Sequence, residues 1–323
     1  MNIKDSLDKG LIHLGTRIVL PPMATEKSDE GRVTENLCRY YKDRAANPLI
    51  GLIITEHMYI AMEGRASKGQ LSIAEDEIMG GLKKLTDTIH KAQSGIKVFA
   101  QVNHAGGKAD PELTGSEPVS SSVHIFKYAD SRVLSKDEIH RIADLFAEAA
   151  LRAKKGGYDG VEIHSAHGYL LNQFYSPLIN NREDEYGPHS MEDRLRFHKE
   201  VLEKVRAAVG PDYPIAVRLG GCDYQEGGST EADAVEAAKL LCAYGADLID
   251  VSGGMNGYII AGHDYPGYFK DMSKAIKEAV DVTVMTTGGV TTTEQAEELL
   301  SYGAADLIGV GRAIYKDAAW GIG

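Results

Sequence analysis

Cysteine is scarce in this chain. Its 323 residues include only Cys38, Cys222 and Cys242, which lie far apart and form no CxxC pair. An odd number of widely spaced cysteines is not the pattern of a disulfide framework, nor of a metal or iron-sulfur cluster held by cysteine thiolates. We therefore expect a reducing compartment and no cysteine-ligated cofactor.

Long hydrophobic runs are also missing. No stretch of about 18 apolar residues occurs, and charged residues or His interrupt the apolar runs near the N-terminus. The sequence shows no sign of a signal peptide or a membrane span, so we expect a cytoplasmic protein.

Positive charge is in deficit. Lys plus Arg is 35 against 47 for Asp plus Glu, which makes the formal net charge −12. An acidic surface repels phosphate backbones and anionic lipids, so neither nucleic acid nor a membrane is expected as a partner. Hydrophobic residues make up 43% of the chain and charged residues 25%, as in ordinary globular proteins. A small molecule is the expected partner, and assembly into homo-oligomers stays open.

Short apolar runs alternate with amphipathic stretches, which is the pattern of βα units around a parallel sheet. The clearest helix is expected over residues 137–155, with Ser135 as its N-cap and Glu138 placed to complete a capping box. Eight strands are expected, over residues 17–20, 49–54, 97–102, 159–163, 215–219, 248–252, 283–286 and 306–309.

This order predicts a single (β/α)8 barrel, a TIM barrel, as one domain over residues 1–323. The helix-to-strand joints GGYDGVEI, YGADLIDV and YGAADLIGV repeat a Gly suited to a left-handed C-cap and an Asp before a strand. Long irregular loops are expected after strands three and four, over residues 103–134 and 164–190. Loops after strands build the catalytic face of such barrels, so the site is expected there. An open doubly wound sheet is the structural alternative.

Three polar side chains follow the fourth strand: His164, His167 and Tyr169. Two imidazole N–H groups can share a substrate oxygen and stabilise enolate-like charge, while a phenol with a pKa of about 10 keeps its proton at neutral pH and can donate it. A metal site is an alternative, with Glu162 as a further ligand, but the HExxH pattern is absent and we predict no metal. A second alternative is that one of the two histidines has a purely structural role.

The sequence resembles the old yellow enzyme family of FMN-dependent, nicotinamide-using oxidoreductases, in particular its compact bacterial ene-reductase branch. The resemblance covers almost the whole chain, and its most specific motifs are EIHSAHGYL and NREDEYG. RIVLPPM, GLIITEH, FAQVNHAGGKA, EDRLRF and ADLIGVGRA appear in the same order as in that family.

The resemblance implies a flavin site. It places the segment Pro21, Pro22, Met23 and Ala24 along the flavin, with His57 near it. It also assigns Gln101 and Arg218 to the polar pyrimidine edge, where a cation favours the reduced anion. The alternatives are a structural ion pair for Arg218 and a loop cap for Gln101.

Phosphate is expected at Gly289, Gly311 and Arg312. These residues follow strands seven and eight, where barrels bind phosphate through backbone N–H groups and a short helix, although such glycines also serve plain turns. No GxGxxG fingerprint is present, so FMN rather than FAD is expected.

Departures from the family pattern affect the substrate more than the cofactor. Ala24 stands where relatives often carry Cys or Thr, Glu26 where the nearest branch often places a Tyr, and His57 where a small residue is usual. They imply an altered redox potential and substrate range. The chain lacks the iron-sulfur extension and second dinucleotide domain of larger relatives, which implies a short member or an early end.

The sequence thus predicts an FMN oxidoreductase that uses NADH or NADPH to reduce the flavin and then the C=C bond of an α,β-unsaturated carbonyl or nitro compound. His164 and His167 are expected to hold the substrate oxygen, and Tyr169 to protonate the α carbon. The alternatives are a flavin-independent, phosphate-binding lyase or isomerase and a non-catalytic barrel that binds a ligand.

Overall fold

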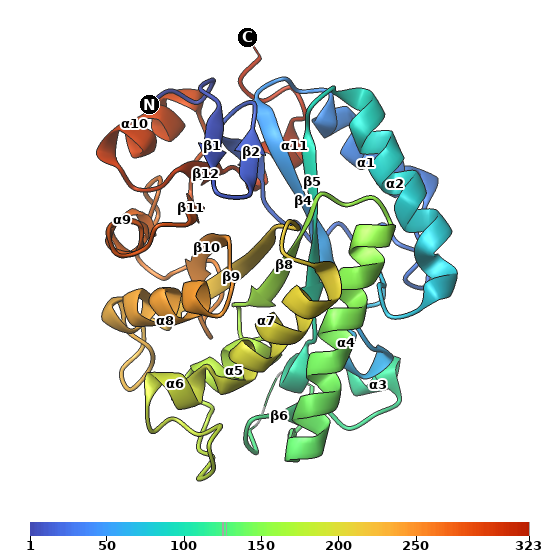
Figure 1. Ribbon diagram of the computed structural model, residues 1–323, viewed down its shortest axis with the longest axis vertical. Coiled ribbons are helices and arrows are strands. Elements are labelled where there is room, and N and C mark those ends of the chain that lie inside the picture. Colours follow the sequence, from blue (N-terminus) through green and yellow to red (C-terminus); the bar gives the residue numbers. More distant parts are fainter. Residues whose placement is uncertain (125, 127, 323) are drawn as a thin grey trace.

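The structure is a computed structural model that describes residues 1–124, 126 and 128–322. Over those residues, eight parallel strands close into a barrel in the order β10-β11-β12-β3-β4-β5-β8-β9 (Figure 1). The predicted fold class is confirmed. The barrel strands are β3 (Ile18–Leu20), β4 (Ile50–Tyr59), β5 (Lys97–Asn103), β8 (Gly160–Ser165), β9 (Ile215–Cys222), β10 (Leu248–Gly253), β11 (Thr283–Thr286) and β12 (Leu307–Gly309).

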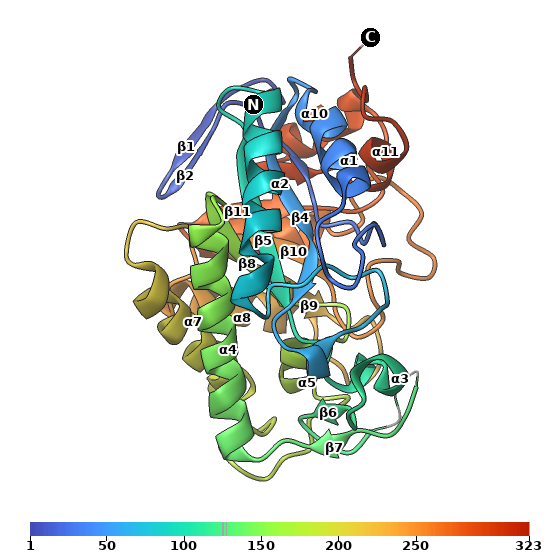
Figure 2. The same cartoon turned by 90° about the vertical axis from the view of Figure 1, so that its right-hand side faces the viewer.

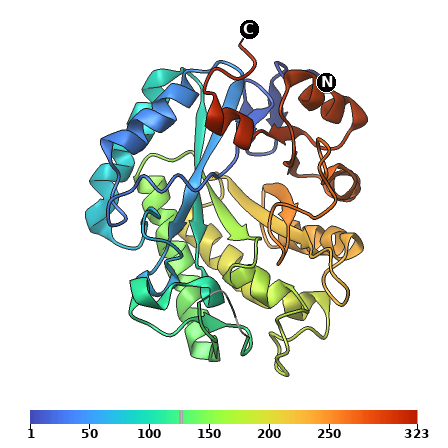
Figure 3. The same ribbon diagram turned by 180° about the vertical axis from the view of Figure 1, so that it is seen from behind.

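Helices follow the strands and surround the barrel, as the view from behind also shows (Figure 3). The helix predicted over residues 137–155 is α4 (Lys136–Lys155), and Ser135 and Glu138 form the expected capping box. The other connecting helices are α1 (Glu35–Ala45), α2 (Met79–Ala92), α7 (Arg196–Val209), α8 (Glu231–Ala243), α9 (Lys270–Ala279) and α10 (Thr293–Tyr302), and α11 (Arg312–Lys316) follows the last strand.

The three repeated helix-to-strand joints have a common role. Gly157, Gly245 and Gly303 all have positive φ, as a left-handed turn requires. The Asp that follows accepts a backbone N–H of the preceding strand in the barrel: Asp159 from Val98, Asp247 from Ile215 and Asp306 from Val284, at 3.0, 2.8 and 3.0 Å. These carboxylates therefore pin adjacent strands together at the end of the barrel remote from the site.

A hairpin that the sequence did not predict lies at the same end of the barrel. Strands β1 (Leu7–Lys9) and β2 (Ile12–Leu14) pair antiparallel and lie near both termini (Figures 1 and 2). Leu7, Ile12 and Leu14 pack in one cluster with inward side chains of the barrel strands. The interior of the barrel is therefore apolar and closed at the end where this hairpin lies. The other members of this cluster are Val19, Leu52, Ile54, Phe99, Ala216, Leu248, Met285 and Leu307.

Side chains alternate along each strand, so the next inward residue after the apolar layer is two positions further on. Phe99 is followed by Gln101, Gly160 by Glu162, Ala216 by Arg218 and Leu248 by Asp250. All four of these polar residues are buried. The interior therefore changes from apolar to charged on the way to the catalytic face.

The two long loops contain more regular structure than predicted. The first holds the short elements η3 (Gly106–Lys108), α3 (Pro111–Thr114), β6 (Val119–Ser120) and β7 (Arg132–Val133), and the second holds α5 (Leu170–Tyr175). The expectation of irregular chain was wrong here, because such short elements depend on contacts between the loops rather than on local periodicity. Residues 125 and 127 of the first loop lie outside the described residues.

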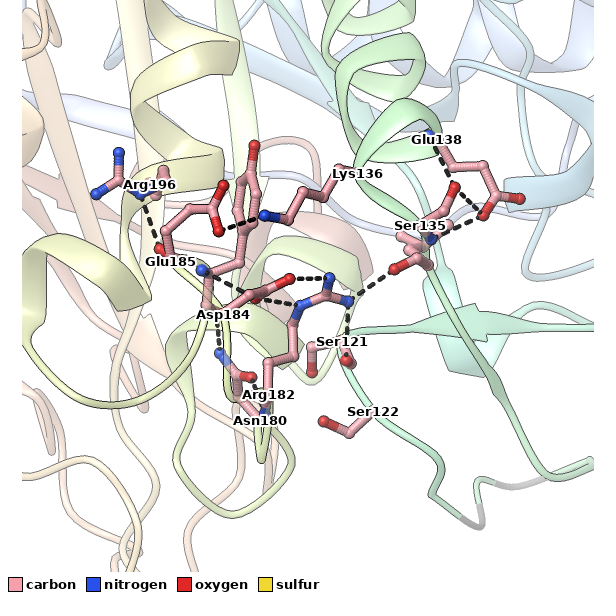
Figure 4. Close-up of polar contacts among 12 residues, drawn as sticks. Ser121, Ser122, Ser135, Lys136, Glu138, Asn180, Arg182, Asp184, Glu185 and Arg196 are labelled. Carbon is pink, nitrogen blue, oxygen red and sulfur yellow. Dashed lines mark hydrogen bonds and ion pairs between the residues drawn. The ribbon is translucent and has the colours of Figure 1, made fainter.

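The NREDEYG motif fastens these loops together (Figure 4). The Arg182 guanidinium is bidentate to Asp184 at 2.9 and 2.6 Å, and it also donates to the carbonyl of Leu134 at 2.7 Å. Lys136, at the start of α4, reaches Glu185 at 2.6 Å. This motif therefore holds the chain that follows β8 against the chain at the start of α4.

Among the helices formed by residues 1–124, 126 and 128–322, none has the length and apolar character that a membrane span requires.

Candidate active site

A cavity of about 250 Å³ lies at the carboxyl ends of the barrel strands. Its lining brings together every residue that the sequence singled out for catalysis or cofactor binding: Pro21, Pro22, Met23, Ala24, His57, Gln101, His164, His167, Tyr169, Arg218, Gly289, Gly311 and Arg312. The sequence did not identify Tyr258, Tyr268, Thr287, Gly288, Val290 and Gly309, which line the same cavity.

Two of the missed residues come from one loop. Tyr258 and Tyr268 lie between β10 and α9, and the Tyr268 hydroxyl donates to the Tyr258 carbonyl at 2.6 Å. The Tyr258 ring meets His167 edge to face at 5.6 Å between ring centres. The length of the segment between strand six and the next helix was the available signal, since loops after strands build the site.

The His-His-Tyr cluster forms where β8 ends and α5 begins. His164 lies on β8, and Tyr169 is the N-cap of α5. The rings of His164 and His167 are 5.1 Å apart and those of His164 and Tyr169 are 5.0 Å apart, both edge to face. His167 has a left-handed backbone with φ +58, and the Lys108 ammonium donates to its carbonyl at 2.6 Å. This contact stabilises a conformation that is costly for a non-glycine residue.

Both histidines are neutral. Burial lowers the pKa of His164 and of His167 well below the usual value, and nearby positive charge, including Arg218, lowers them further. The Ala166 N–H donates to Nδ1 of His164 at 3.2 Å, so the proton of that neutral ring is on Nε2. Nε2 of His167 is 2.7 Å from the Ser252 hydroxyl.

Tyr169 keeps its proton over a wide pH range. Burial raises the pKa of its phenol to about 12, and the negative charge of Glu26 contributes to the increase. The cluster therefore combines neutral imidazoles with a protonated phenol around one cavity.

Buried charged residues of the barrel strands adjoin the cavity. Arg218 pairs with Asp250 on the neighbouring strand, with Nε 3.2 Å from the carboxylate oxygen. The ion pair that the sequence left open as an alternative thus exists, yet Arg218 also lines the cavity. Gln101 donates from Nε2 to Glu162 at 2.8 Å.

This arrangement places two carboxyl groups beside one cation. Burial raises the pKa of Glu162 well above its usual value, and Asp250 raises it further. Burial likewise raises the pKa of Asp250 to about 6, against the opposing effect of Arg218. We conclude that at neutral pH Glu162 holds a proton and Asp250 balances Arg218, since two buried anions beside one cation are costly.

The predicted phosphate residues lie on adjacent loops. Gly288 and Gly289 have φ of +107 and +73, and Gly311 directly precedes α11. A Cβ on Gly289 would lie 2.7 Å from the Tyr265 carbonyl oxygen, so the backbone needs glycine there. Within the described ranges, the N–H groups of Gly289 and Gly311 find no backbone acceptor. They are available to a ligand.

Glu26 is not one of the residues that line the cavity. Its carboxylate accepts hydrogen bonds from the Ser67 hydroxyl at 2.6 Å and from the Gly69 N–H at 2.9 Å. It therefore acts on the site through its charge rather than by contact. In the part of the chain that the structure describes, no group of three or more His, Cys, Asp or Glu side chains is arranged to hold a metal ion.

The amino-acid sequence is similar to that of one family of flavin oxidoreductases and to those of curated relatives. The sequence model of the NADH:flavin oxidoreductase / NADH oxidase family matches residues 7–322. An NADH oxidase of Thermoanaerobacter brockii is 37% identical over 320 residues, which cover 96% of this chain and 48% of that protein. An NADPH dehydrogenase of Halalkalibacterium halodurans is 36% identical over 313 residues, covering 96% and 89% of the two chains. This chain thus spans about half the length of the first relative.

Solved structures of known proteins also superpose on this fold. A 2-naphthoyl-CoA reductase in complex with 2-naphthoyl-CoA superposes with a TM-score of 0.92 at 26% identity, over 98% of this chain and 51% of that one. An old yellow enzyme homologue from Zymomonas mobilis superposes with a TM-score of 0.83 at 28% identity, over 97% and 89%. These matches confirm the resemblance to old yellow enzymes and the predicted cofactors, FMN with a nicotinamide reductant. The chain therefore belongs to the NADH:flavin oxidoreductase / NADH oxidase family.

Proposed function

We propose that residues 1–323 form one FMN-binding domain that uses NADH or NADPH to reduce the C=C bond of an electron-poor alkene, such as an α,β-unsaturated carbonyl or nitro compound. The observation that carries this proposal is the convergence of a neutral imidazole pair, a protonated phenol and a buried cation on one cavity.

The chemistry of the cavity fits FMN. Arg218 is a buried residue of the cavity lining. Its Nε is fully enclosed and faces Asp250. Its two terminal guanidinium nitrogens are not fully enclosed, and they have no hydrogen-bond partner in the described part of the protein. At the other side, the glycine amides of residues 289 and 311 and the Arg312 side chain can meet a phosphate. The segment Pro21–Pro22–Met23–Ala24 and Gln101 would hold the ring system between them.

Bound FMN would supply the hydride chemistry that connects the nicotinamide with the β carbon of the alkene. The protein supplies charge stabilisation and a proton. The Nε2–H of His164, together with His167, would bind the oxygen of the activating group and stabilise negative charge that develops there. Tyr169 would then protonate the α carbon, because its phenol is protonated at physiological pH.

The experiment is a product analysis with the purified protein. Heat-released cofactor is identified by mass, and oxidation of NADH and of NADPH is then coupled to formation of cyclohexanone from 2-cyclohexenone under anaerobic conditions. Both nicotinamides are needed because the two relatives are named for different ones. We expect FMN and stoichiometric cyclohexanone; a protein that contains FMN and oxidises the nicotinamide without reducing the alkene would refute the substrate class.

A further inference from the structure

A bulge in β4 turns His57 toward the cavity. The register pairs Thr55 with Ala100 and then Met58 with Val102, so Glu56 and His57 together lie opposite the single residue Gln101. Bulges redirect side chains and are frequent beside active sites. Glu56 is buried and its carboxylate accepts a hydrogen bond from Thr25, whereas His57 lines the cavity.

The hydrogen bonds around His57 fix its tautomer. The Ala66 N–H donates to the Gln70 amide oxygen at 2.7 Å, which identifies the other end of that amide as the NH₂ group. This NH₂ is 3.0 Å from Nδ1 of His57, and the NH₂ of Asn103 is 3.2 Å from the same nitrogen. Nδ1 must therefore accept, and Nε2 carries the proton.

His57 is also neutral, and it lies beside the groups that face the substrate. Burial lowers the pKa of His57 to about 4, although the charge of Glu26 partly opposes that shift. Its ring centre is 5.3 Å from that of Tyr169 and 6.1 Å from that of His164. The rings of His57, His164 and Tyr169 thus form a triangle, and each of the two histidines carries an Nε2–H donor close to the expected proton donor.

We propose that His57 is a substrate-binding residue: its Nε2–H is a second hydrogen-bond donor site, separate from the His164–His167 pair, and it favours neutral ring substrates with two acceptor oxygens, such as cyclic imides or quinones. This inference rests on the proposed function and narrows its substrate class. Because Glu26 and Arg218 act on His57 with opposite signs, the neutral imidazole donors rather than a net charge would select the ligand.

The test uses two ligands of one ring size on the FMN-loaded protein. Succinimide has two carbonyl oxygens and cyclopentanone has one, and neither offers an activated C=C bond, so binding is measured at equilibrium through the flavin absorption spectrum. The variants are His57→Leu, which removes the donor at similar size, and His57→Gln, which keeps an N–H donor.

One neutral hydrogen bond corresponds to about 2- to 10-fold in affinity. We expect His57→Leu to weaken succinimide binding by that factor and to leave cyclopentanone binding unchanged, with His57→Gln restoring most of the loss. If His57→Leu bound both ligands as wild type does, or weakened both equally, the assignment of His57 would be overturned. Absence of FMN from the wild-type protein would instead contradict the proposed function.

A second variant tests the tautomer without touching the ligand. Gln70 is a positioning residue, since its NH₂ group directs the proton of His57 to Nε2. In Gln70→Leu, Asn103 remains as the weaker donor to Nδ1, so the ¹⁵N NMR shifts of His57 should move toward a mixture of the two tautomers in which Nε2–H is still present, and succinimide affinity should fall in part. Unchanged ¹⁵N shifts and unchanged affinity would exclude this role of Gln70.

Discussion

Gln101 on β5 donates a hydrogen bond to Glu162 on β8, and the two residues are also direct register partners in the barrel. The other carboxyl oxygen of Glu162 is buried without a partner. Gln101 uses its NH₂ group for the bond to Glu162, so its amide oxygen is the polar group that remains. Gln101 lines the cavity, and we propose that this oxygen meets the flavin there. Under that proposal, Gln101 connects the buried carboxyl group of Glu162 with the cofactor.

The first prediction concerns Arg218 and the reduced cofactor. A cation beside the pyrimidine edge stabilises negative charge that is present only after reduction, so Arg218→Ala should lower the midpoint potential of bound FMN. Arg218→Lys keeps the charge and should lower it less. Spectroelectrochemistry of the FMN-loaded variants measures the potential. A normal potential in Arg218→Ala at full FMN occupancy would show that the arginine serves only its ion pair with Asp250.

The second prediction is a pH dependence of stability. A carboxyl group whose pKa is raised in the folded state binds more protons there than in the unfolded chain, so its contribution to stability falls as pH rises from the unfolded pKa through the folded one. Glu162 has such a raised pKa. Relative to wild type, Glu162→Gln should therefore gain unfolding free energy as pH increases, by about 1.4 kcal/mol for each unit of pKa shift that is removed.

Urea unfolding between pH 5 and 8, at one fixed FMN concentration, gives this difference. Subtracting wild type from variant at each pH cancels the buried histidines, which have the opposite trend because their folded pKa is lowered. A difference that stays constant across the range would mean that Glu162 is ionised in the folded protein.

The third prediction compares two glycines. Gly289→Ala and Gly303→Ala both force an alanine into a left-handed conformation, with φ of +73 and +80, at a cost of about 1–2 kcal/mol, and the Cβ at position 289 adds a close contact of 2.7 Å with the Tyr265 carbonyl oxygen. Only position 289 lines the cavity, whereas a Cβ at Gly303 meets nothing within 4 Å. Both variants should lose stability, but only Gly289→Ala should bind FMN more weakly to the apoprotein in a fluorescence titration. Equal FMN affinity in the two would remove the phosphate role from this loop.

The fourth prediction concerns the imidazole pair. His164→Ala combined with His167→Ala removes both groups proposed to bind the substrate oxygen, so phenolic ligands should bind more weakly, by about 10-fold or more for two hydrogen bonds. The flavin spectrum reports the binding. Phenol affinity equal to that of wild type would place the oxygen elsewhere in the cavity.

Sequence patterns predicted the elements whose signal is local. Each barrel strand was predicted because a run of apolar residues marks it, and α4 because of its 3.6-residue period and its Ser135 cap. Strand β4 was predicted to stop at Ile54, yet it continues to Tyr59. Thr55, Glu56 and His57 break the apolar pattern there, and the strand continues because Met58 and Tyr59 pair with β5 again after the bulge.

Other features depend on residues distant in sequence. The β1–β2 hairpin has strands of only three residues, so its alternation of buried and exposed side chains is too short to mark a strand, and it forms because Leu7, Ile12 and Leu14 fill the barrel. Strand ends and family motifs placed the site residues, and the ordinary pKa of a phenol already predicted a protonated Tyr169, whereas the neutral state of the buried histidines depends on tertiary burial. The tautomer of His57, for example, depends on Gln70 and Asn103, which are far along the chain.

The measurement that tests the central claim most directly is stopped-flow timing of the two half-reactions in Tyr169→Phe. Flavin reduction by the nicotinamide requires no proton for an alkene, so it should proceed at nearly the wild-type rate. Reoxidation by 2-cyclohexenone should slow by about 10² to 10⁴-fold, the usual cost of removing a general acid. An enone is required because strongly activated nitroalkenes can take their proton from solvent. If Tyr169→Phe slowed only the nicotinamide step, or reoxidised at the wild-type rate, the proposed mechanism would be contradicted.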